Sequence, residues 1–362
     1  MNIVFLSSCS WTSISSRLGE YYEFRSFQMK RGVKGLLLVF LVILSIATLG
    51  AQAVAEKQEI KVLILNMFEV GENKGDYAGE FQHFYEAYLD GAESYQLSKM
   101  PLTLYVNEQG IAGCIAGMGK AQSASSLTAI LSDPRFDCSN TYILVSGCSG
   151  MSPERGTLGD VVWADELVDF ELGHGWLESD KSSPDDGTFL RSKGYDRPGY
   201  IKLNKALAQW AYDITSDVVL SDDKAAAAYR ATYGAEEALE KPSVRMGVSV
   251  TGDSYWHGAA SSVRADEITA VYGAGTYMVT QMEDNAFGVV AMNYDLLDRL
   301  LVCRDVVNYD QPAPNQSVRE SLDASSGAFS MGMKNGFAVS KVVVDEIVAN
   351  WDTYKTSIPS VN

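Results

Sequence analysis

Short apolar runs of strand length alternate with helical patterns along most of the chain of 362 residues. The run at 61–67 reads KVLILNM, and the run at 141–146 reads TYILVS. Between them, aromatic residues at positions 81, 84, 85 and 88 recur at the spacing of one helix face. This alternation predicts an α/β layer fold.

The same patterns place the other elements. We expect further strands at 102–106, 111–116, 159–164, 245–251, 277–281 and 300–306, and helices at 120–131, 203–218, 222–240, 283–299 and 336–351. The segment 178–242 combines a long loop with helices and holds too few strands for a second core. We therefore expect it to be a helical insertion within a single domain that spans 56–362.

Residues 29–55 have the form of a secretory signal peptide. Basic residues from Lys30 precede an apolar segment, and small residues at Ala51 and Ala53 suit a cleavage site. An uncleaved anchor is the alternative, because about 18–20 apolar residues can cross a bilayer. We expect a periplasmic or secreted protein, interpret 1–28 as a wrongly assigned gene start, and expect no transmembrane path through the mature chain.

Composition excludes several classes of function. The net charge of −17 opposes unaided binding to nucleic acid or anionic lipid. The three histidines show no metal-ligand spacing, and neither a P-loop nor a GxGxxG motif is present, so we expect no metal and no cofactor. One disulfide can form in an oxidising compartment, but the sequence leaves its pairing open among Cys114, Cys138, Cys148 and Cys303.

Three glycine-rich segments each follow an expected strand. They read GMGKAQSAS at 117–125, SGCSG at 146–150 and TGDSYWHG at 251–258. Open sheets bind ligands outside the carboxyl ends of their strands, so these segments predict one shared crevice. The alternative is that the glycines only close tight turns.

Five segments, taken in order, resemble the purine nucleoside permease family, which shares its fold with nucleoside phosphorylases and nucleosidases. They are TYILVSGCSGMSPERGTLGDVVWA, AYRATYG, TGDSYWHG, QMEDNAFGVVA and NYDQP, and the resemblance covers nearly all of 60–352. It implies a three-layer nucleoside phosphorylase-like fold, in which helices cover both faces of a central mixed sheet. It also implies periplasmic binding and uptake of purine nucleosides. A purine nucleosidase that cleaves the N-glycosidic bond with water is the alternative, and a phosphorylase is less favoured.

The resemblance also implies which residues hold a purine nucleoside or nucleobase. Met282 and Glu283 would grip the ribose, because a carboxylate can accept hydrogen bonds from two vicinal hydroxyls. Tyr255 and Trp256 would flank the purine ring. Asn308 would recognise the base edge, since its amide both donates and accepts.

Further candidates surround this set. The glycine-rich turn would contact the ligand through Gly147, Cys148 and Ser149. His257 would bond the sugar 5′-hydroxyl. In the nucleosidase alternative, Glu69 would activate water and Asp310 would protonate the leaving base. Each has a plain structural alternative, such as an exposed helix-start carboxylate, a core aromatic or a turn aspartate.

The sequence disfavours a phosphate site. The loop after the first strand has no arginine and carries four acidic side chains, and Val145 stands where phosphorylases place a second arginine. Phosphorolysis would need a distant arginine, such as Arg155 or Arg304, to fold into the crevice. As partners we expect no nucleic acid, and an inner-membrane transporter and a second copy of the chain remain open.

Overall fold

The computed structural model describes residues 56–97, 100–191, 194 and 196–360. Residues Lys57–Asn362 group into one compact unit. The predictions for 1–28 and for the signal peptide at 29–55 lie outside the described residues. Within the described residues, no helix combines the length and apolar character needed to span a membrane.

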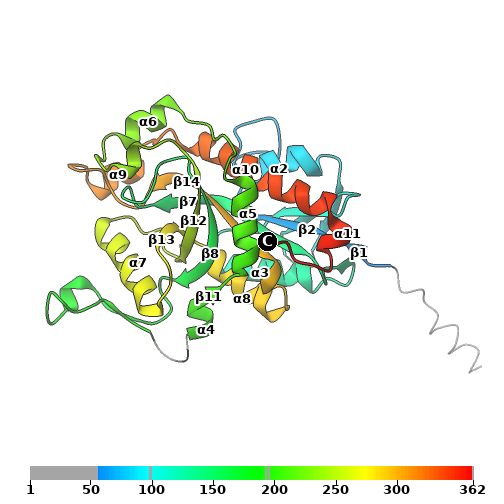
Figure 1. The fold of residues 1–362 in the computed structure, drawn as a ribbon, viewed down its shortest axis with the longest axis horizontal. Coiled ribbons are helices and arrows are strands. Elements are labelled where there is room, and N and C mark those ends of the chain that lie inside the picture. Colours follow the sequence, from blue (N-terminus) through cyan, green and yellow to red (C-terminus); the bar gives the residue numbers. More distant parts are fainter. Residues whose placement is uncertain (1–55, 98–99, 192–193, 195, 361–362) are drawn as a thin grey trace, which may run out of the picture. The chain divides into compact units, whose positions relative to one another are not determined.

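A mixed sheet of ten strands forms the centre of this unit (Figure 1). Its strands are β2 (Val62–Asn66), β3 (Glu93–Gln96), β4 (Thr103–Val106), β5 (Ile111–Ile115), β7 (Tyr142–Met151), β8 (Val161–Asp169), β11 (Tyr200–Lys202), β12 (Val244–Thr251), β13 (Tyr277–Gln281) and β14 (Leu300–Tyr309). The order is β11-β8-β12-β13-β7-β2-β5-β4-β3, and β14 pairs with both β7 and β8. The pairings therefore close a ring through β7, β14, β8, β12 and β13.

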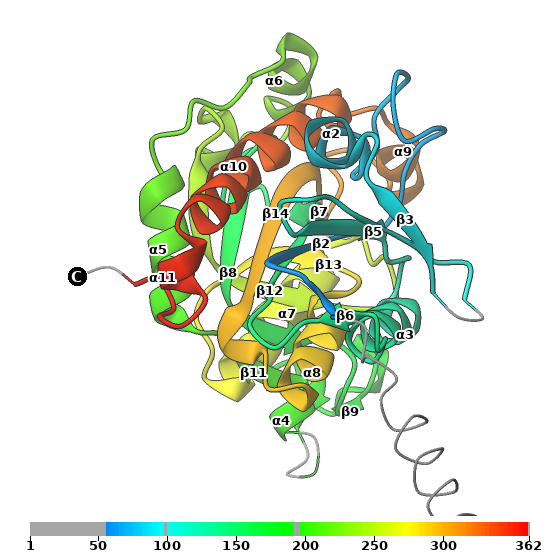
Figure 2. The same ribbon diagram turned by 90° about the vertical axis from the view of Figure 1, so that its right-hand side faces the viewer.

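Helices cover both faces of the sheet, as the family resemblance implies (Figure 2). Successive side chains of β2 point to opposite faces. Leu63 and Leu65 join a core cluster with α3 (Lys120–Leu131) and α8 (Asp284–Asn293). Val62 and Ile64 join a second cluster with α5 (Lys205–Thr215) and α10 (Phe329–Ala349). The mixed sheet with helices on both faces is thus confirmed as a three-layer arrangement.

Apart from α7 (Ala259–Tyr272), a helix of 14 residues, the remaining elements are short. Two small pairs join β1 (Gln58–Glu59) to β6 (Phe136–Asp137) and β9 (His174–Gly175) to β10 (Phe189–Leu190). The other α-helices are α2 (Gln82–Phe84), α4 (Asp196–Gly199), α6 (Lys224–Arg230), α7 (Ala259–Tyr272), α9 (Val318–Asp323) and α11 (Trp351–Tyr354). A π-helix at Tyr85–Leu89 extends α2.

Two helical expectations differ from the structure. The helix expected at 222–240 is reduced to α6 and a 3₁₀ turn at Glu237–Leu239. The sequence patterns did not indicate α7, whose buried face consists of small and polar residues as well as Ile268 and Tyr272. A helix face of this composition gives only a weak apolar period, so it escapes detection by pattern.

The glycine-rich segment at 146–150 is strand rather than loop. β7 continues through it to Met151, because β14 pairs in parallel with β7 from Ile143 to Met151. The segment 178–242 also contributes to the main sheet, since β11 pairs antiparallel with β8. Among the described residues, Cys114, Cys138, Cys148 and Cys303 are all free thiols.

Candidate functional site

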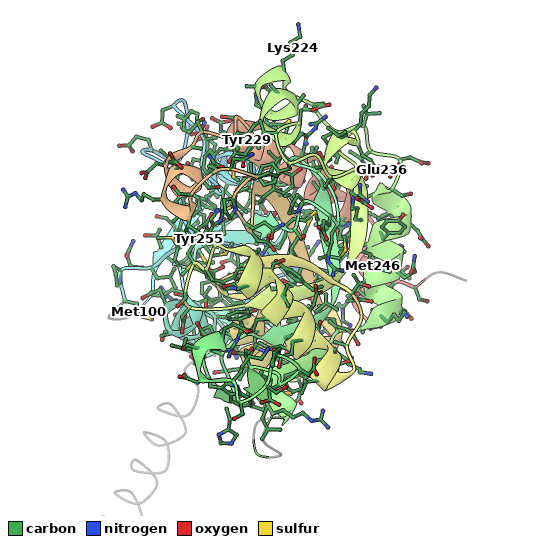
Figure 3. The ribbon with its side chains drawn as sticks, turned by 90° about the vertical axis from the view of Figure 1, so that its left-hand side faces the viewer. Met100, Lys224, Tyr229, Glu236, Met246 and Tyr255 are labelled. Carbon is green, nitrogen blue, oxygen red and sulfur yellow. The ribbon has the colours of Figure 1, made fainter. Side chains whose placement is uncertain are left out.

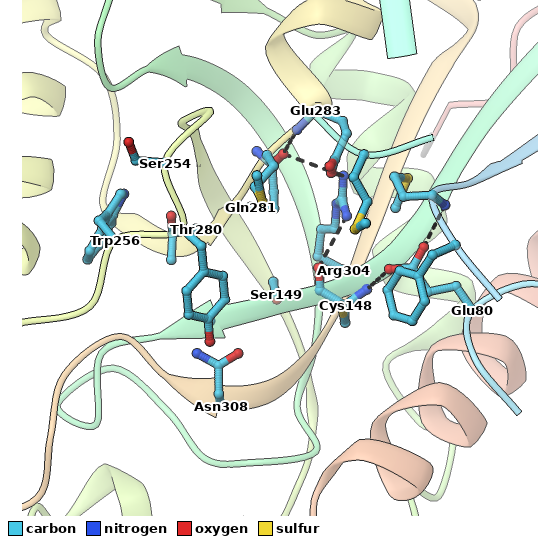
Figure 4. A pocket seen from close by; sticks show the side chains of 16 residues that line it. Glu80, Cys148, Ser149, Ser254, Trp256, Thr280, Gln281, Glu283, Arg304 and Asn308 are labelled. Carbon is cyan, nitrogen blue, oxygen red and sulfur yellow. Dashed lines mark hydrogen bonds and ion pairs between the residues drawn. The ribbon is translucent and has the colours of Figure 1, made fainter. Parts of the chain in front are cut away.

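A cavity of about 210 Å³ opens beyond the carboxyl ends of β2, β7, β12, β13 and β14 (Figure 4). The strand order thus brings the ends of distant segments to one place, as expected for an open α/β sheet. Most of the predicted binding residues line this cavity: Cys148, Ser149, Tyr255, Trp256, Met282, Glu283 and Asn308.

One end of the cavity holds a buried ion network around Arg304. This side chain lies in the middle of β14 and is only 1% exposed. Its Nη2 donates to Oε2 of Glu283 at 3.1 Å and to Oδ1 of Asp284 at 2.5 Å, and its Nη1 donates to the Cys148 carbonyl at 3.2 Å. A buried guanidinium needs such partners, and here they fix the carboxylate of Glu283 in space.

The other carboxylate oxygen of Glu283 is also held. The N–H of Gly119 donates to its Oε1 at 3.0 Å. Gly119 has a φ of 82°, a left-handed conformation that glycine adopts without strain, and this orients its N–H toward the carboxylate. Each carboxylate oxygen has two lone pairs, so both oxygens of Glu283 retain capacity to accept ligand hydroxyls.

Burial and charge set the protonation of this network. Burial raises the pKa of Glu283, while the nearby charge of Arg304 opposes that rise. Burial alone would lower the pKa of Arg304, but the charges of Asp284 and Glu283 raise it on balance. Arg304 therefore stays cationic, and Glu283 faces a permanent positive charge.

A second carboxyl group in the cavity belongs to Glu80, one of the four acidic residues in the loop after the first strand, which the sequence did not single out as a site residue. Its Oε2 accepts from the N–H of Met67 at 2.6 Å, and its Oε1 accepts from the N–H of Cys148 at 2.9 Å. Burial raises the pKa of Glu80 to about 8, although Arg304 pulls in the other direction. Glu80 is thus a neutral or readily ionised acid at the wall of the cavity.

Glu69, the predicted water activator, lies outside the cavity lining. Its side chain accepts hydrogen bonds from the backbone N–H groups of Phe81 at 3.0 Å, Gln82 at 2.5 Å and Gly79. The N–H groups of Phe81 and Gln82 are free groups at the start of α2, which a carboxylate stabilises. The structure therefore gives Glu69 a helix-capping position and brings Glu80, from the same loop, to the cavity.

The other end of the cavity is aromatic. Trp256 stacks on Phe170 with ring centroids 5.1 Å apart and is held in the wall. Tyr255 is 57% exposed and has Asn308 as a hydrogen-bonding partner. The amide of Asn308 donates from Nδ2 to the Tyr309 carbonyl at 2.8 Å, so its oxygen is directed elsewhere (Figure 4).

Three predicted residues lie beside the cavity rather than in its lining. Gly147 packs closely on two residues that line the cavity, because an added Cβ would lie 2.1 Å from Met67 and 2.6 Å from Glu80. His257 bonds Ser321 at 2.9 Å in a neighbouring hollow. Asp310 accepts from Tyr277 at 2.9 Å, and burial raises its pKa to about 6.

The charges at the cavity do not favour an anion. Arg304 folds into the cavity, but Glu283 and Asp284 already neutralise it. Arg155 pairs with Asp266 at 2.6 Å, and it is absent from the cavity lining. A phosphate dianion would therefore meet buried carboxyl groups without a cation of its own.

Comparison with known proteins gives the family. The sequence profile described as purine nucleoside permease (NUP) matches residues 59–359. The chain belongs to this family. A probable purine nucleoside permease of Schizosaccharomyces pombe is 29% identical over 318 residues, which are 80% of this chain and 90% of that protein. The purine nucleoside permease of Candida albicans is 29% identical over 65% of this chain and 63% of its own length.

Comparison with solved structures identifies the fold of this chain. Futalosine hydrolase of Helicobacter pylori has a TM-score of 0.53 at 16% identity and covers 79% of this chain and 98% of its own. A 5′-methylthioadenosine/S-adenosylhomocysteine nucleosidase of the same organism gives 0.52 at 17% identity, with the coverage at 79% and 98%. These likenesses confirm the predicted nucleoside phosphorylase-like fold.

Proposed function

We propose that this member of the permease family binds a purine nucleoside in the 210 Å³ cavity and acts in nucleoside uptake. The carrying observation is the buried Glu283, which Arg304 and the N–H of Gly119 hold in place while its carboxylate faces the cavity. Such a preorganised acceptor suits two neighbouring ribose hydroxyls. The names of the permease relatives supply the purine nucleoside as the ligand.

The aromatic end supports a purine on the same ligand. Tyr255 and Trp256 offer ring faces, and Asn308 offers an amide to the base edge. Met282 adds a flexible thioether beside Glu283, where it can pack on a sugar ring. The two ends of the cavity together suit a ligand with a diol at one end and a flat heterocycle at the other.

Titration calorimetry tests the binding directly. We expect adenosine, inosine or guanosine to bind with measurable heat, and uridine to bind more weakly because its single ring fills less of the aromatic end. The 2′-deoxynucleosides serve as the ligand control, since they lack one of the two hydroxyls that Glu283 would accept. Equal binding of purine nucleosides and uridine would contradict the proposal.

A purine nucleosidase activity is a second candidate, and the position of Glu80 favours it. This carboxyl lines the same cavity as Glu283, and its raised pKa of about 8 suits transfer of a proton near neutral pH. In hydrolysis, the carboxylate form would take a proton from water as the water attacks the sugar carbon. The C–N bond then breaks and its electrons pass to the purine. The purine takes up a proton from solvent while Glu80 returns its own, so that free ribose and free base result.

Product analysis separates binding from cleavage. Purified protein would be incubated with adenosine, inosine or guanosine, and the free base would be measured by chromatography. Cleavage that falls strongly in Glu80→Gln but persists in Glu72→Gln, an exposed carboxylate outside the cavity, would support the nucleosidase. Binding without any released base would contradict the nucleosidase and leave nucleoside uptake as the proposed function.

We further propose that the protein works in the periplasm or outside the cell after removal of residues 29–55. The basic residues at the start of this segment and the small residues at its expected cleavage site support this localisation. A transporter in the inner membrane would then receive the nucleoside. Adenosine uptake by cells that express the full chain, compared with cells that express a chain without 29–55, tests both points. Equal uptake by the two cell lines would contradict them.

A further inference from the structure

A second cavity of about 340 Å³ adjoins the nucleoside cavity. The two cavities share Tyr255 and Asn308 as a common wall. Figure 3 shows Tyr255 and Tyr229, both of which line the second cavity, on the same side of the molecule. The second cavity therefore begins where the proposed purine ends and lies away from Glu283, which is not in its lining.

The walls of the second cavity are polar but uncharged. Hydroxyl groups come from Tyr229, Ser321 and Ser330, among others, and no Asp, Glu, Lys or Arg is among the described residues that line it. Tyr77 stacks on Phe329 with centroids 5.7 Å apart and supplies an aromatic face. A charged group would enter this space without a counter-ion, whereas a neutral group with hydroxyls would find both donors and acceptors.

His257 adds a group that no neighbour satisfies. Its Nε2 lies 2.9 Å from Oγ of Ser321, and its buried Nδ1 has no hydrogen-bond partner among the described residues. Burial lowers the pKa of His257, so the ring is neutral at neutral pH and can donate or accept.

The volumes of the two cavities also favour a ligand that occupies both. The nucleoside cavity, at about 210 Å³, is smaller than the roughly 300–1,000 Å³ that small-molecule sites usually provide. The second cavity is larger than the first. A ligand that extends past Asn308 would use both spaces and bury more of its surface.

We propose that the second cavity is a subsite for an uncharged, hydroxyl-bearing substituent on the purine base of the bound nucleoside. This inference rests on the proposed nucleoside site, because it takes the base to lie at Tyr255 and Asn308. It names a substrate class, base-modified purine nucleosides, that the family description does not state.

Three matched adenosines test the subsite by calorimetry: unsubstituted adenosine, an N6-(hydroxyalkyl) adenosine and an N6-(carboxyalkyl) adenosine of equal chain length. We expect the hydroxyalkyl compound to bind at least as tightly as adenosine, and the carboxyalkyl compound to bind at least about tenfold more weakly. A 2-(hydroxyalkylamino) adenosine covers the other edge of the base, and a 5′-O-(hydroxyalkyl) adenosine covers the sugar end.

A filling variant shows whether the substituent occupies the second cavity. Ser325 lines this cavity only and is exposed, so Ser325→Trp fills the space with little effect on folding, and Ser330→Trp is a second choice. Ser182→Trp, at an exposed serine outside both linings, is the matched control. We expect Ser325→Trp to weaken the hydroxyalkyl compound about tenfold while adenosine stays within about twofold.

The outcomes are distinct. If adenosine binds but both base-substituted hydroxyalkyl compounds are rejected, the subsite inference fails and the nucleoside site stands. If only the 5′-substituted compound gains affinity, or if Ser182→Trp acts like Ser325→Trp, the subsite assignment also fails. If no purine nucleoside binds at all, the proposed function itself is overturned, and the inference falls with it.

Discussion

The guanidinium of Arg304 and the carboxylate of Glu283 form an ion pair that is almost completely shielded from solvent. Nη2 and Oε2 lie 3.1 Å apart, and the two residues are 1% and 3% exposed. Arg304 also bonds Asp284, so one cation serves two carboxylates at the start of α8. This arrangement fixes the proposed ribose acceptor and explains why an arginine in the cavity does not create an anion site.

Removal of Arg304 should destabilise the fold strongly. Arg304→Met leaves Asp284 and Glu283 buried without their cation, and breaking such a pair costs about 3–5 kcal/mol. Urea unfolding at neutral pH measures the loss. Arg319→Met is the control, because Arg319 pairs with Asp323 on the surface, where the change should stay within about 0.5 kcal/mol. Equal stability of Arg304→Met and the unchanged protein would contradict the network.

Glu283→Gln should weaken the binding of ribonucleosides specifically. The amide keeps the size of the side chain but loses the charge that two ribose hydroxyls would share, a loss of about 1.5–3 kcal/mol. We therefore expect affinity for adenosine or inosine to fall at least about tenfold, while the free bases change much less. Glu72→Gln is the matched control at an exposed site. Unchanged ribonucleoside affinity would remove Glu283 from the site.

The pKa of Glu80 predicts a pH dependence of stability. In the folded protein the carboxyl holds its proton until about pH 8, whereas its ordinary pKa is 4.5. The folded state therefore binds more protons between these values, and the free energy of unfolding should fall as pH rises from about 4.5 to 8. This contribution is fully present below the ordinary pKa and is lost above the folded one.

Glu80→Gln isolates this contribution. The variant should be less stable at low pH, because its amide nitrogen cannot accept the N–H of Met67 or Cys148. Its stability should nevertheless change less between pH 5 and 8 than that of the unchanged protein in urea unfolding. Some slope should remain, since burial also raises the pKa of Asp305, to about 7. An identical slope in both proteins would contradict the raised pKa of Glu80.

Glu69 provides a contrast from the same loop. Its side chain accepts the N–H groups of Phe81 and Gln82, so Glu69→Gln should cost about 0.5–2 kcal/mol of stability, as loss of a helix cap does. Purine nucleoside affinity at a temperature where the variant is folded should not change. A large loss of affinity with unchanged stability would return Glu69 to the site.

The sequence predicted the layers well because the central strands are buried on both faces and read as continuous apolar runs. It misplaced the end of β7, because only the pairing with β14, far along the chain, shows that the strand continues through Gly147 and Cys148. Likewise α7 buries small and polar residues, whose periodicity is weak. Long-range pairing and small-residue packing are not local properties of a sequence.

The candidate site was predictable where its residues sit at strand ends in recognisable segments, as Tyr255, Glu283 and Asn308 do. The choice between Glu69 and Glu80 was not, because both belong to one acidic loop. The folded loop alone decides which carboxylate caps α2 and which meets β7. Arg304 was considered only as an anion ligand, and its neutralisation by Asp284 depends on tertiary contacts.

Phosphate should have no part in ligand binding or in any cleavage. Arg304 is the one cationic side chain among the described residues that line the cavity, and Glu283 and Asp284 already neutralise it. Lys74, the basic residue of the acidic loop, pairs with Asp90 at 2.7 Å and is outside the lining. A dianion entering the cavity would approach Glu283 and the ionisable Glu80, which disfavours it.

Adenosine affinity measured by calorimetry should therefore be the same, within about twofold, with and without millimolar phosphate. Any base released from inosine should appear at the same rate in both buffers, with free ribose and not ribose 1-phosphate as the sugar product. Sulfate at equal ionic strength is the control, because it separates a specific phosphate effect from screening of charges. Turnover that requires phosphate would show that the Arg304 network opens to admit an anion, and the neutralised cavity described above would then be only one of its states.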